Sequence, residues 1–412
     1  MSDIRDISLA PLGHKRIEWV KDYMPVLRDI EKRFIRERPF EGLRISVCVH
    51  LEAKTAYLGL LLRAGGADVS ITGSNPLSTK DDICAALAED KMDVHAWFNA
   101  TPGEFSEHIR KTLEFRPHII IDDGGEFVEM LSRYPEYAEN LIGGCEETTT
   151  GIHRLRARER AGTLRFPMLA VNDANCKHLF DNRHGTGQSV WDAIMFTTNC
   201  MVTGRTVVVA GYGFCSSGIA NRAKGLGANV IVTEINPHRA LEAAMDGFRV
   251  MKMDDAAPLG DIFVTATGCK DVIVARHFER MKDNAIVANA GHFDVEASRR
   301  DLEAMAVSSF ERKPFITGYR MKDGRTINLM AEGRLVNIAA GNGHPADIMD
   351  LSFAIQALGA EYLVKHGREL APGLYKVPED IDNAVAMTKL NDMGLGLDTL
   401  TEEQRDYWEG NI

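Results

Sequence analysis

Five short polar clusters in this 412-residue chain combine side chains that can move protons. Each holds a carboxylate, an imidazole or a lysine, the usual general acids and bases of enzymes. Each also follows a short apolar run or a turn. Taken singly, a cluster has an ordinary structural explanation, such as a histidine that ends a strand or an exposed ion pair four residues apart on a helix. The clusters are His50–Thr55, Asp122–Gly125, Glu146–Thr150, Asn172–Asn182 and Gly291–Asp294.

A glycine-rich turn forms a sixth cluster. Gly211 and Gly213 follow an apolar run and precede a helical segment, with Ser216 where the dinucleotide fingerprint has its third glycine. Glu234 lies 21 positions after Gly213, where the fingerprint expects an acid that binds the ribose hydroxyls. A carboxylate there repels a 2′-phosphate, so the pattern favours NAD over NADP. The alternative is a glycine turn that only packs.

These clusters need a scaffold that brings them together. Apolar, β-branched runs alternate with helical segments along the chain, which predicts parallel, doubly wound sheets. Ligands of such sheets bind beyond the carboxyl ends of the strands, where the clusters lie. The runs that predict strands are 44–50, 67–72, 118–122, 167–171, 205–210, 230–234, 261–265 and 285–288.

We therefore expect an α/β fold with two doubly wound, parallel-sheet (Rossmann-like) domains joined by hinge segments. The expected boundaries are 1–183 with 345–380 for a substrate-binding domain, 184–344 for an NAD-binding domain, and 381–412 for a short C-terminal segment. A break at Gly341–Pro345 and a helix from 344 to 365 take the chain back to the first domain. Two crossovers between domains allow opening and closing around a ligand.

Composition narrows the classes of function. The formal net charge of −11 disfavours nucleic-acid and anionic-membrane partners, which need a positive face. No run approaches the roughly 18 apolar residues of a membrane span. The seven cysteines form no Cys-x-x-Cys pair, which favours reduced thiols over a disulfide framework or a zinc site. We expect a cytoplasmic protein without a metal.

Over nearly its whole length, the sequence resembles the S-adenosylhomocysteine hydrolase family. The matches occur in order at separate places along the chain. The segments that carry the resemblance are Asp122-Asp-Gly-Gly125, Glu146-Glu-Thr-Thr-Thr-Gly151, Val171-Asn-Asp173, Lys177 with Phe180-Asp-Asn182, Ala210-Gly-Tyr-Gly213, Val232-Thr-Glu-Ile235, Thr267-Gly-Cys269, Gly291-His-Phe-Asp294 and Gly343-His-Pro345.

The resemblance implies a redox-neutral hydrolysis with bound NAD: oxidation of the ribose 3′-OH, loss of homocysteine from C5′, addition of water and reduction. Lys177, with its pKa lowered by burial, and Asp181 would act at the 3′-OH. Glu147 would orient the hydroxyls, and Asp123 would take the C4′ proton. His50 and His292 would serve the 5′ position. Spacing alone does not separate base from orienter.

The resemblance also implies two sets of binding residues. Those for substrate are Glu52, Lys54, Thr55 and His344. Those for NAD are Thr148, Thr149, Thr150, Asn182, Gly211, Gly213, Phe214, Cys215, Glu234, Asn236, Thr267, Asn289 and Asn337.

One departure from the family bears on the substrate. Relatives that act on adenosylhomocysteine carry His-x-Thr-x-Gln or His-x-Thr-x-Glu, whereas this chain has His50-Leu-Glu52-Ala-Lys54. A lysine has donors but no acceptor for the 6-amino group of adenine. Lys54 on O6 and Glu52 on N1–H instead match hypoxanthine, so we expect S-inosyl-L-homocysteine as substrate, as in a branch of the family. The alternatives are S-adenosyl-L-homocysteine, and an exposed Glu52–Lys54 pair at a helix start.

Other features leave alternatives open. Thr186 stands near where many relatives have a cysteine, and the chain ends without the Lys- and Tyr-containing tail that reaches a neighbouring subunit's NAD in longer relatives. A homotetramer is the family expectation. A catalytically silent NAD-binding regulator predicts gaps in the catalytic set, which is complete here. A 2-hydroxy-acid dehydrogenase has a similar two-domain plan but releases NADH on turnover.

Overall fold

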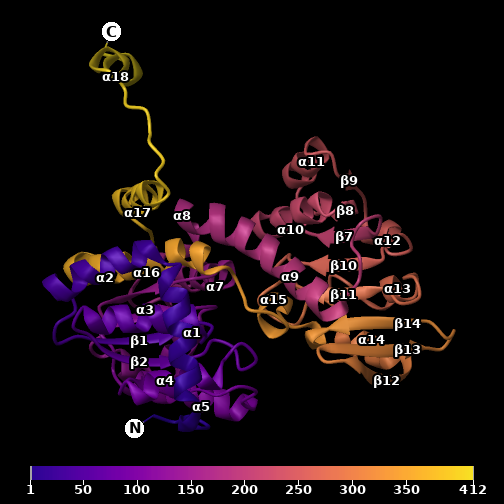
Figure 1. The fold of residues 1–412 in the computed structure, drawn as a ribbon, viewed down its shortest axis with the longest axis horizontal. Coiled ribbons are helices and arrows are strands. Elements are labelled where there is room, and N and C mark those ends of the chain that lie inside the picture. Colours follow the sequence, from indigo (N-terminus) through magenta and orange to yellow (C-terminus); the bar gives the residue numbers. More distant parts are fainter. Residues whose placement is uncertain (1, 412) are drawn as a thin grey trace.

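The computed structural model describes residues 2–411, which form two lobes side by side, each built on one β-sheet (Figure 1). The first lobe holds a seven-stranded parallel sheet in the order β15-β6-β5-β4-β1-β2-β3. Its central strands are buried on both faces, as parallel sheets require. Its strands are β1 (Arg44–Cys48), β2 (Asp68–Thr72), β3 (Asp93–Val94), β4 (Ile119–Asp122), β5 (Gly143–Glu146), β6 (Pro167–Ala170) and β15 (Gly373–Lys376).

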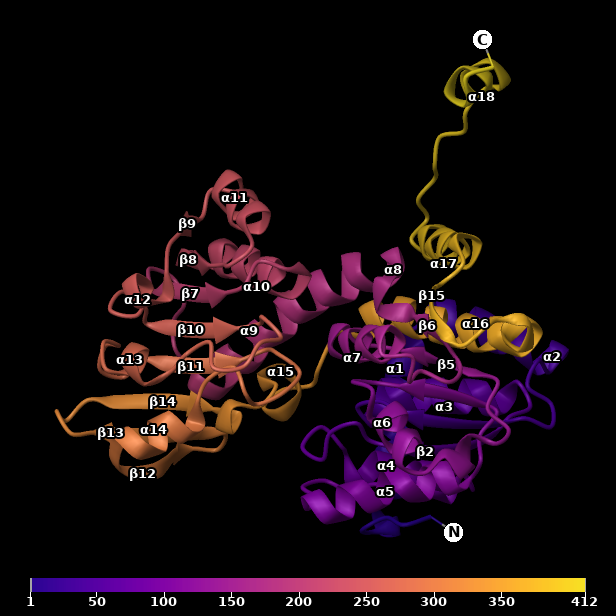
Figure 2. The same ribbon diagram turned by 180° about the vertical axis from the view of Figure 1, so that it is seen from behind.

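Helices cover this sheet on both faces (Figure 2). Pro25 begins the second of two N-terminal helices, because proline is tolerated in a first helical turn and not inside a helix. The helices are η1 (Ile7–Leu9), α1 (Ala10–Asp22), α2 (Pro25–Glu37), α3 (Ala53–Ala64), α4 (Asp81–Glu89), α5 (Pro102–Glu114), α6 (Glu126–Arg133), η2 (Pro135–Ala138), α7 (Thr149–Arg160), η3 (Val171–Asp173), α8 (Asn175–Lys177), α16 (Ala346–His366), η6 (Gly367–Glu369) and α17 (Glu379–Asp392).

The second lobe holds an eight-stranded sheet in the order β12-β13-β14-β11-β10-β7-β8-β9. From β14 to β9 the pairs are parallel, whereas β12-β13 and β13-β14 are antiparallel. The expected parallel sheet is thus correct for the core and extended by an unexpected hairpin. The strands are β7 (Thr206–Ala210), β8 (Asn229–Thr233), β9 (Arg249–Val250), β10 (Ile262–Thr265), β11 (Ile286–Asn289), β12 (Ala306–Lys313), β13 (Ile316–Met321) and β14 (Thr326–Met330).

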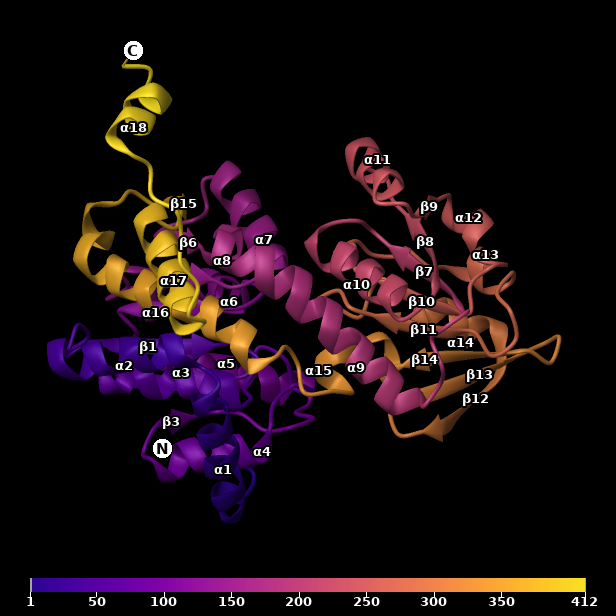
Figure 3. The same cartoon turned by 45° about the horizontal axis from the view of Figure 1, so that its top comes forward.

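Two segments connect the lobes. The first is a π-helix, η4 (His178–Gly185), that leads into α9; the second is the hinge between α15 and α16 (Figure 3). A π-helix is rare and is found mostly at functional sites. Helix α16 packs on α2, α3, β4 and β5, so the chain does return to the first lobe. The remaining helices are α9 (Thr186–Thr198), α10 (Phe214–Gly225), α11 (Pro237–Met245), α12 (Met253–Ala256), α13 (Ala275–Phe278), α14 (Arg299–Met305), η5 (Ala331–Gly333) and α15 (Val336–Ala339).

The chain ends away from both lobes. Helix α18 (Glu402–Glu409) stands at the end of an extended, exposed segment, residues 395–400 (Figure 1). Tyr407 and Trp408 on this helix are 77% and 78% exposed. Within residues 2–411, no helix is both long and apolar enough to cross a membrane.

Candidate active site

A cavity of about 930 Å³ lies between the lobes. In the first sheet the strand order reverses between β1 and β4, and in the second between β7 and β10. Such switch points open a crevice beyond the carboxyl ends of the strands. The turns after these four strands all line the cavity, so one pocket joins the two switch points. Every site residue predicted from the sequence lines it except Asn289.

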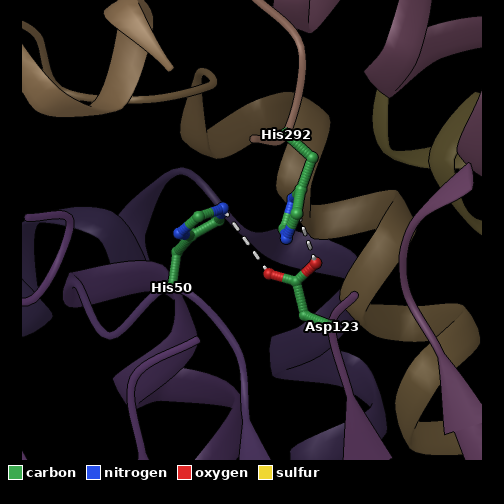
Figure 4. Close-up of side chains that lie close together, drawn as sticks. All are labelled: His50, Asp123 and His292. Carbon is green, nitrogen blue, oxygen red and sulfur yellow. Dashed lines mark ion pairs between the residues drawn. The ribbon is translucent and has the colours of Figure 1, made fainter. Parts of the chain in front are cut away.

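At one end of the cavity, the Asp123 carboxylate lies between two imidazoles (Figure 4). Its oxygens are 3.5 Å from His50 Nε2 and 4.0 Å from His292 Nδ1. Ser74 Oγ donates a 2.7 Å hydrogen bond to it, and Ser78 Oγ lies 2.7 Å from His50 Nδ1. His50 and Asp123 belong to the first lobe and His292 to the second, so this cluster exists only while the lobes are together.

The surroundings set the charges of these groups. Burial lowers the pKa of His50 to about 4, against the opposing pull of Asp123, so His50 is neutral at neutral pH. Burial alone would raise the pKa of Asp123, but His50, His292 and the Ser74 hydrogen bond outweigh it and hold that pKa below its usual value. The cluster therefore offers a carboxylate that can accept a proton beside a neutral imidazole. Its three groups also lie within 4.8 Å of one another, a spacing that could hold a metal ion.

A buried lysine between two carboxylates forms a second cluster. Lys177 Nζ lies 3.0 Å from Glu147 Oε1 and pairs closely with Asp181 Oδ2. All three residues are at most 5% exposed. Asp181 also pairs with His344 Nδ1 from the hinge, and His344 Nε2 lies 3.2 Å from Thr186 Oγ1. The π-helix and the hinge, which are the two connections between lobes, thus meet at Asp181.

The charge of Lys177 differs from the expectation. Burial alone would lower its pKa, but the carboxylates of Asp181 and Glu147 outweigh burial and raise the pKa well above its usual value. The prediction of a lowered pKa was wrong because it took burial into account and omitted the neighbouring charges. Burial raises the pKa of Glu147 despite Lys177, whereas Lys177 and His344 overcome burial and hold the pKa of Asp181 far below its usual value.

Two neutral side chains of α16 hold these carboxylates, and the sequence did not single them out. Ser352 Oγ donates to Asp181 Oδ2 at 2.8 Å, and Gln356 Nε2 donates to Glu147 Oε2 at 2.5 Å. Both residues are 0% exposed. Their spacing of four residues on the expected 344–365 helix places them on one face, but serine and glutamine carry no charge that marks them as functional.

The Glu52–Lys54 pair lies at the cavity and not in bulk solvent. Lys54 Nζ is 2.9 Å from Glu52 Oε2 and donates to the Asn342 carbonyl oxygen of the hinge at 3.1 Å. The two side chains are 8% and 15% exposed. Glu52 also caps α3 by accepting from Lys54 N. The structural role considered for Glu52 is therefore present, but the exposed pair is not.

The second lobe offers a cradle for a dinucleotide. Gly211 has a φ of +94°, which favours glycine, and a Cβ on Gly213 would meet no atom within 4 Å, so the turn before α10 has free space at a helix N-terminus. Glu234 holds the neighbouring turn by accepting from the backbone N–H groups of Tyr212, Ile235 and Asn236 at 2.6–2.9 Å. Asn337 Oδ1 is buried and without a hydrogen-bond partner among residues 2–411. These features fit NAD.

Asn289 is the predicted cofactor residue that does not line the cavity. Its side chain donates to the carbonyl oxygens of Gly291 and Phe293 and accepts from Gly291 N. Thr265 Oγ1 also donates to it. Asn289 therefore fixes the turn that presents His292. Asn172 has a comparable bridging position, because its Oδ1 accepts from Thr149 and Asn182, and it does line the cavity.

Comparison with known proteins identifies the family of this chain. The model for "S-adenosyl-L-homocysteine hydrolase" matches residues 2–133, and the model for its NAD-binding domain matches residues 182–343. An S-inosyl-L-homocysteine hydrolase of Methanopyrus kandleri is 55% identical over 411 residues, which cover 98% of this chain and 97% of that one.

Two further relatives differ from each other in the substrate that their names give. An adenosylhomocysteinase of Thermococcus kodakarensis is 55% identical over 98% of this chain and 97% of that one. An S-inosyl-L-homocysteine hydrolase of Methanocaldococcus jannaschii is 52% identical over 99% of each chain. Sequence identity alone thus does not choose between the two substrates.

Proposed function

The chain belongs to the S-adenosyl-L-homocysteine hydrolase family and is an NAD-binding hydrolase; on that premise we propose that it hydrolyses S-inosyl-L-homocysteine reversibly to inosine and L-homocysteine. The observation that carries the choice of purine is the Glu52–Lys54 pair at the cavity, in which Lys54 is buried and Glu52 is partly buried. Such an activity would clear the by-product of methyl transfer and serve S-adenosylmethionine regeneration.

The pair favours a 6-oxopurine for reasons of hydrogen bonding. Hypoxanthine presents an acceptor at O6 and a donor at N1–H. Lys54 Nζ can donate to the first and Glu52 can accept from the second, with a charge assisting each bond. Adenine presents a donor at the 6-amino group, which would face the Lys54 donors. A buried donor left without an acceptor costs about 1–3 kcal/mol. A site of this kind discriminates strongly between the two bases.

The remaining residues fit the family's chemistry on the sugar. NAD, when bound, takes up the hydride from C3′ and later returns it. We assign Lys177, Glu147 and Asp181 to the 3′-hydroxyl, where a buried ammonium can orient the hydroxyl by donating to it and a carboxylate beside the ammonium can receive its proton. We assign Asp123 to the C4′ proton, because it is an ionised, buried carboxylate with one oxygen, Oδ1, that has no hydrogen-bond partner within residues 2–411.

His50 and His292 then serve C5′. Both flank Asp123, and their rings are 5.9 Å apart. A neutral His50 can accept a proton from water or return one to the leaving thiolate of homocysteine. Thr55 donates from Oγ1 to the His50 carbonyl oxygen at 2.6 Å, which supports this turn. For the cofactor, the free space at Gly213 and the free acceptor of Asn337 give the strongest support. Gly211 and Glu234 are assigned from their places after β7 and β8, where the dinucleotide fingerprint has them.

The second candidate is hydrolysis of S-adenosyl-L-homocysteine. The Thermococcus kodakarensis relative, named an adenosylhomocysteinase, favours it because its identity to this chain equals that of the Methanopyrus kandleri relative. The chemistry at the sugar would be the same, and only the contacts of the base would differ.

Condensation in the reverse direction separates the two candidates. The purified protein is mixed with L-homocysteine and equal amounts of inosine and adenosine, and the products are measured by mass spectrometry. We expect S-inosyl-L-homocysteine to form faster, with no net NADH released. Faster formation of S-adenosyl-L-homocysteine would reject the role of Glu52 and Lys54. Net release of NADH would reject the hydrolase chemistry.

We also propose the domain boundaries, with one adjustment. Residues 1–183 and 345–380 would form the substrate-binding domain and 184–344 the NAD-binding domain. Position 381 falls inside α17, whose Asp382 caps α8 by accepting from Asn175 N and Cys176 N. We therefore extend the first domain to residue 392. Limited proteolysis should cut between 394 and 400 and leave α17 attached.

A homotetramer in the cytoplasm remains part of the proposal. Phe196 at the end of α9 and Met201 after it are 89% and 70% exposed, as expected for residues that another subunit covers. All seven cysteines are free, which suits a reducing compartment. Light scattering of the purified protein tests the tetramer, and a dimer or a monomer would reject it.

A further inference from the structure

Helix α16 places two neutral hydrogen-bond donors one turn apart, and each holds one carboxylate beside Lys177. Ser352 donates to Asp181 and Gln356 donates to Glu147. The two carboxylates nevertheless differ in environment. Asp181 also pairs with His344 and keeps a very low pKa, whereas burial raises the pKa of Glu147. Of the two carboxylates, Glu147 is therefore the one that takes up a proton more readily.

Glu147 has one oxygen for each partner. Oε1 lies 3.0 Å from the Lys177 ammonium, and Oε2 accepts from Gln356 Nε2 at 2.5 Å. A proton on Glu147 is therefore best placed at Oε2, away from the positive charge. Oε2 would then become a donor and could no longer accept a hydrogen bond from the Gln356 amide nitrogen.

Gln356 carries a hydrogen-bond acceptor for a proton on Glu147 Oε2. Its amide oxygen Oε1 is buried and has no hydrogen-bond partner within the described chain, residues 2–411. An amide that turns by 180° exchanges its donor for its acceptor with little change of shape. Turned in this way, Gln356 would accept from a protonated Glu147, and in the present orientation it donates to an ionised one.

We propose that Gln356 is a positioning residue whose amide follows the charge of Glu147, so that Glu147 takes and returns the proton of the 3′-hydroxyl. This inference rests on the proposed function and assigns the proton to a residue other than Lys177. In the oxidation step the O–H proton passes to the Lys177–Glu147 pair and is held at Glu147 Oε2. The C3′–H bond breaks with its electron pair leaving for the nicotinamide, and the C–O bond becomes a double bond.

Lys177 then has a different role from the expected base. It is already an ammonium ion, so it cannot accept another proton, but it can donate a hydrogen bond to the sugar oxygen. A positive charge there stabilises the oxygen while its proton is leaving. The carboxylate of Asp181, held by Ser352 and His344, keeps Lys177 charged throughout.

The test measures the pH dependence of the first half-reaction. Inosine is added to the NAD-loaded enzyme without homocysteine, and reduction of bound NAD is followed at its characteristic absorbance. The variant Gln356→Leu removes the donor to ionised Glu147, which raises the pKa of Glu147 further. Glu147 must be ionised to accept a proton. The acid limb of the pH–rate profile should therefore move to higher pH by about one unit, so that at a pH where Glu147 is mostly protonated the rate falls about tenfold.

Two further variants separate this role from simple packing. Gln356→Glu keeps the size of the side chain but places a second carboxyl against Glu147, so its acid limb should also move to higher pH. Ser352→Ala lies on the same face of α16 and removes a donor to Asp181. Because the pKa of Asp181 is far below the measured range, its acid limb should stay where it is in the wild type.

Several outcomes would overturn the inference. One is a Gln356→Leu enzyme that folds and binds NAD but keeps the wild-type acid limb. If Gln356→Leu does not fold, a Gln356→Glu enzyme with an unshifted limb has the same meaning. An equal shift in Ser352→Ala would show that the whole cluster is disturbed. Failure of inosine and adenosine alike to reduce NAD in the wild type would instead reject the proposed function.

Discussion

Replacing Lys54 with glutamine should move the preference of the enzyme from inosine toward adenosine. The Lys54 side chain is 8% exposed, and its Nζ lies 2.9 Å from Glu52 Oε2 and 3.1 Å from the Asn342 carbonyl oxygen. Its three donors suit the O6 atom of hypoxanthine and none can accept from the 6-amino group of adenine. The Lys54→Gln amide has an oxygen that can accept from that amino group, and its nitrogen can still donate to the hinge.

The size of the change follows from the burial of this pair. A hydrogen bond from a charged donor is worth about 1.5–3 kcal/mol, and each 1.4 kcal/mol is a factor of ten. The kcat/KM for inosine should therefore fall about 10- to 100-fold. A new amide bond to adenine is worth about 1 kcal/mol, so the kcat/KM for adenosine should rise several-fold. The ratio of the two would change by about two orders of magnitude.

The assay measures initial rates of condensation of L-homocysteine with each nucleoside. Lys54→Met keeps most of the side-chain length without a polar end. It should lower the kcat/KM for inosine without raising the kcat/KM for adenosine. Lys80→Gln changes another lysine near Glu52 that does not line the cavity, and it should leave the ratio near that of the wild type. If Lys54→Gln alters the two nucleosides by the same factor, Lys54 does not read the base.

Three further changes test other parts of the structure. Gly151→Ala should lower the free energy of unfolding by about 2–4 kcal/mol in a urea titration, because its Cβ would lie 2.0 Å from the Glu146 carboxyl carbon; an unchanged midpoint would contradict this packing. The folded-state pKa of His50 is below the unfolded value of about 6.5, so stability falls as the pH drops from about 6.5 toward 4. His50→Asn should reduce this fall in the free energy of unfolding by about 1–3 kcal/mol. If the free energy of unfolding of wild type and variant falls in parallel with pH, His50 is not responsible. Glu234→Ala should weaken NAD binding about tenfold, as measured by calorimetry, and lower the ratio of the affinity for NAD to that for NADP. Equal NAD affinities in variant and wild type would reject the role of Glu234 at the ribose.

Much of this architecture could be predicted because it follows from patterns that are local in the sequence. The strand that precedes Gly211 and the acid at Glu234 both have the positions that the dinucleotide fingerprint gives them. The alternation of strands and helices then placed the polar clusters at one crevice. Pro25 begins a new helix for an equally local reason, because its ring excludes it from a helix interior.

The rest depends on contacts between distant segments. The raised pKa of Lys177 comes from two carboxylates, and only the fold shows that both are close enough to outweigh burial. Gln356 lies 209 residues from Glu147 in the sequence, and no spacing rule joins them. Asn289 is a polar residue at the end of a strand, where a cofactor contact is expected, but its side chain forms hydrogen bonds to the backbone of the turn that follows it. The antiparallel hairpin of β12 and β13 extends an edge that strand–helix alternation does not describe.

The pair between Asp181 and His344 has a consequence for the timing of catalysis. These residues sit on the two peptide connections between the lobes, so a swing of the lobes that separates the connections must break the pair. The acid that keeps Lys177 charged would lose a partner at that moment. Oxidation of the sugar would thus begin only after the cleft has shut, and the reactive ketone would not meet bulk water before it is reduced again. If the finished nucleoside leaves by the same opening, the breaking of this pair becomes a natural limit on turnover.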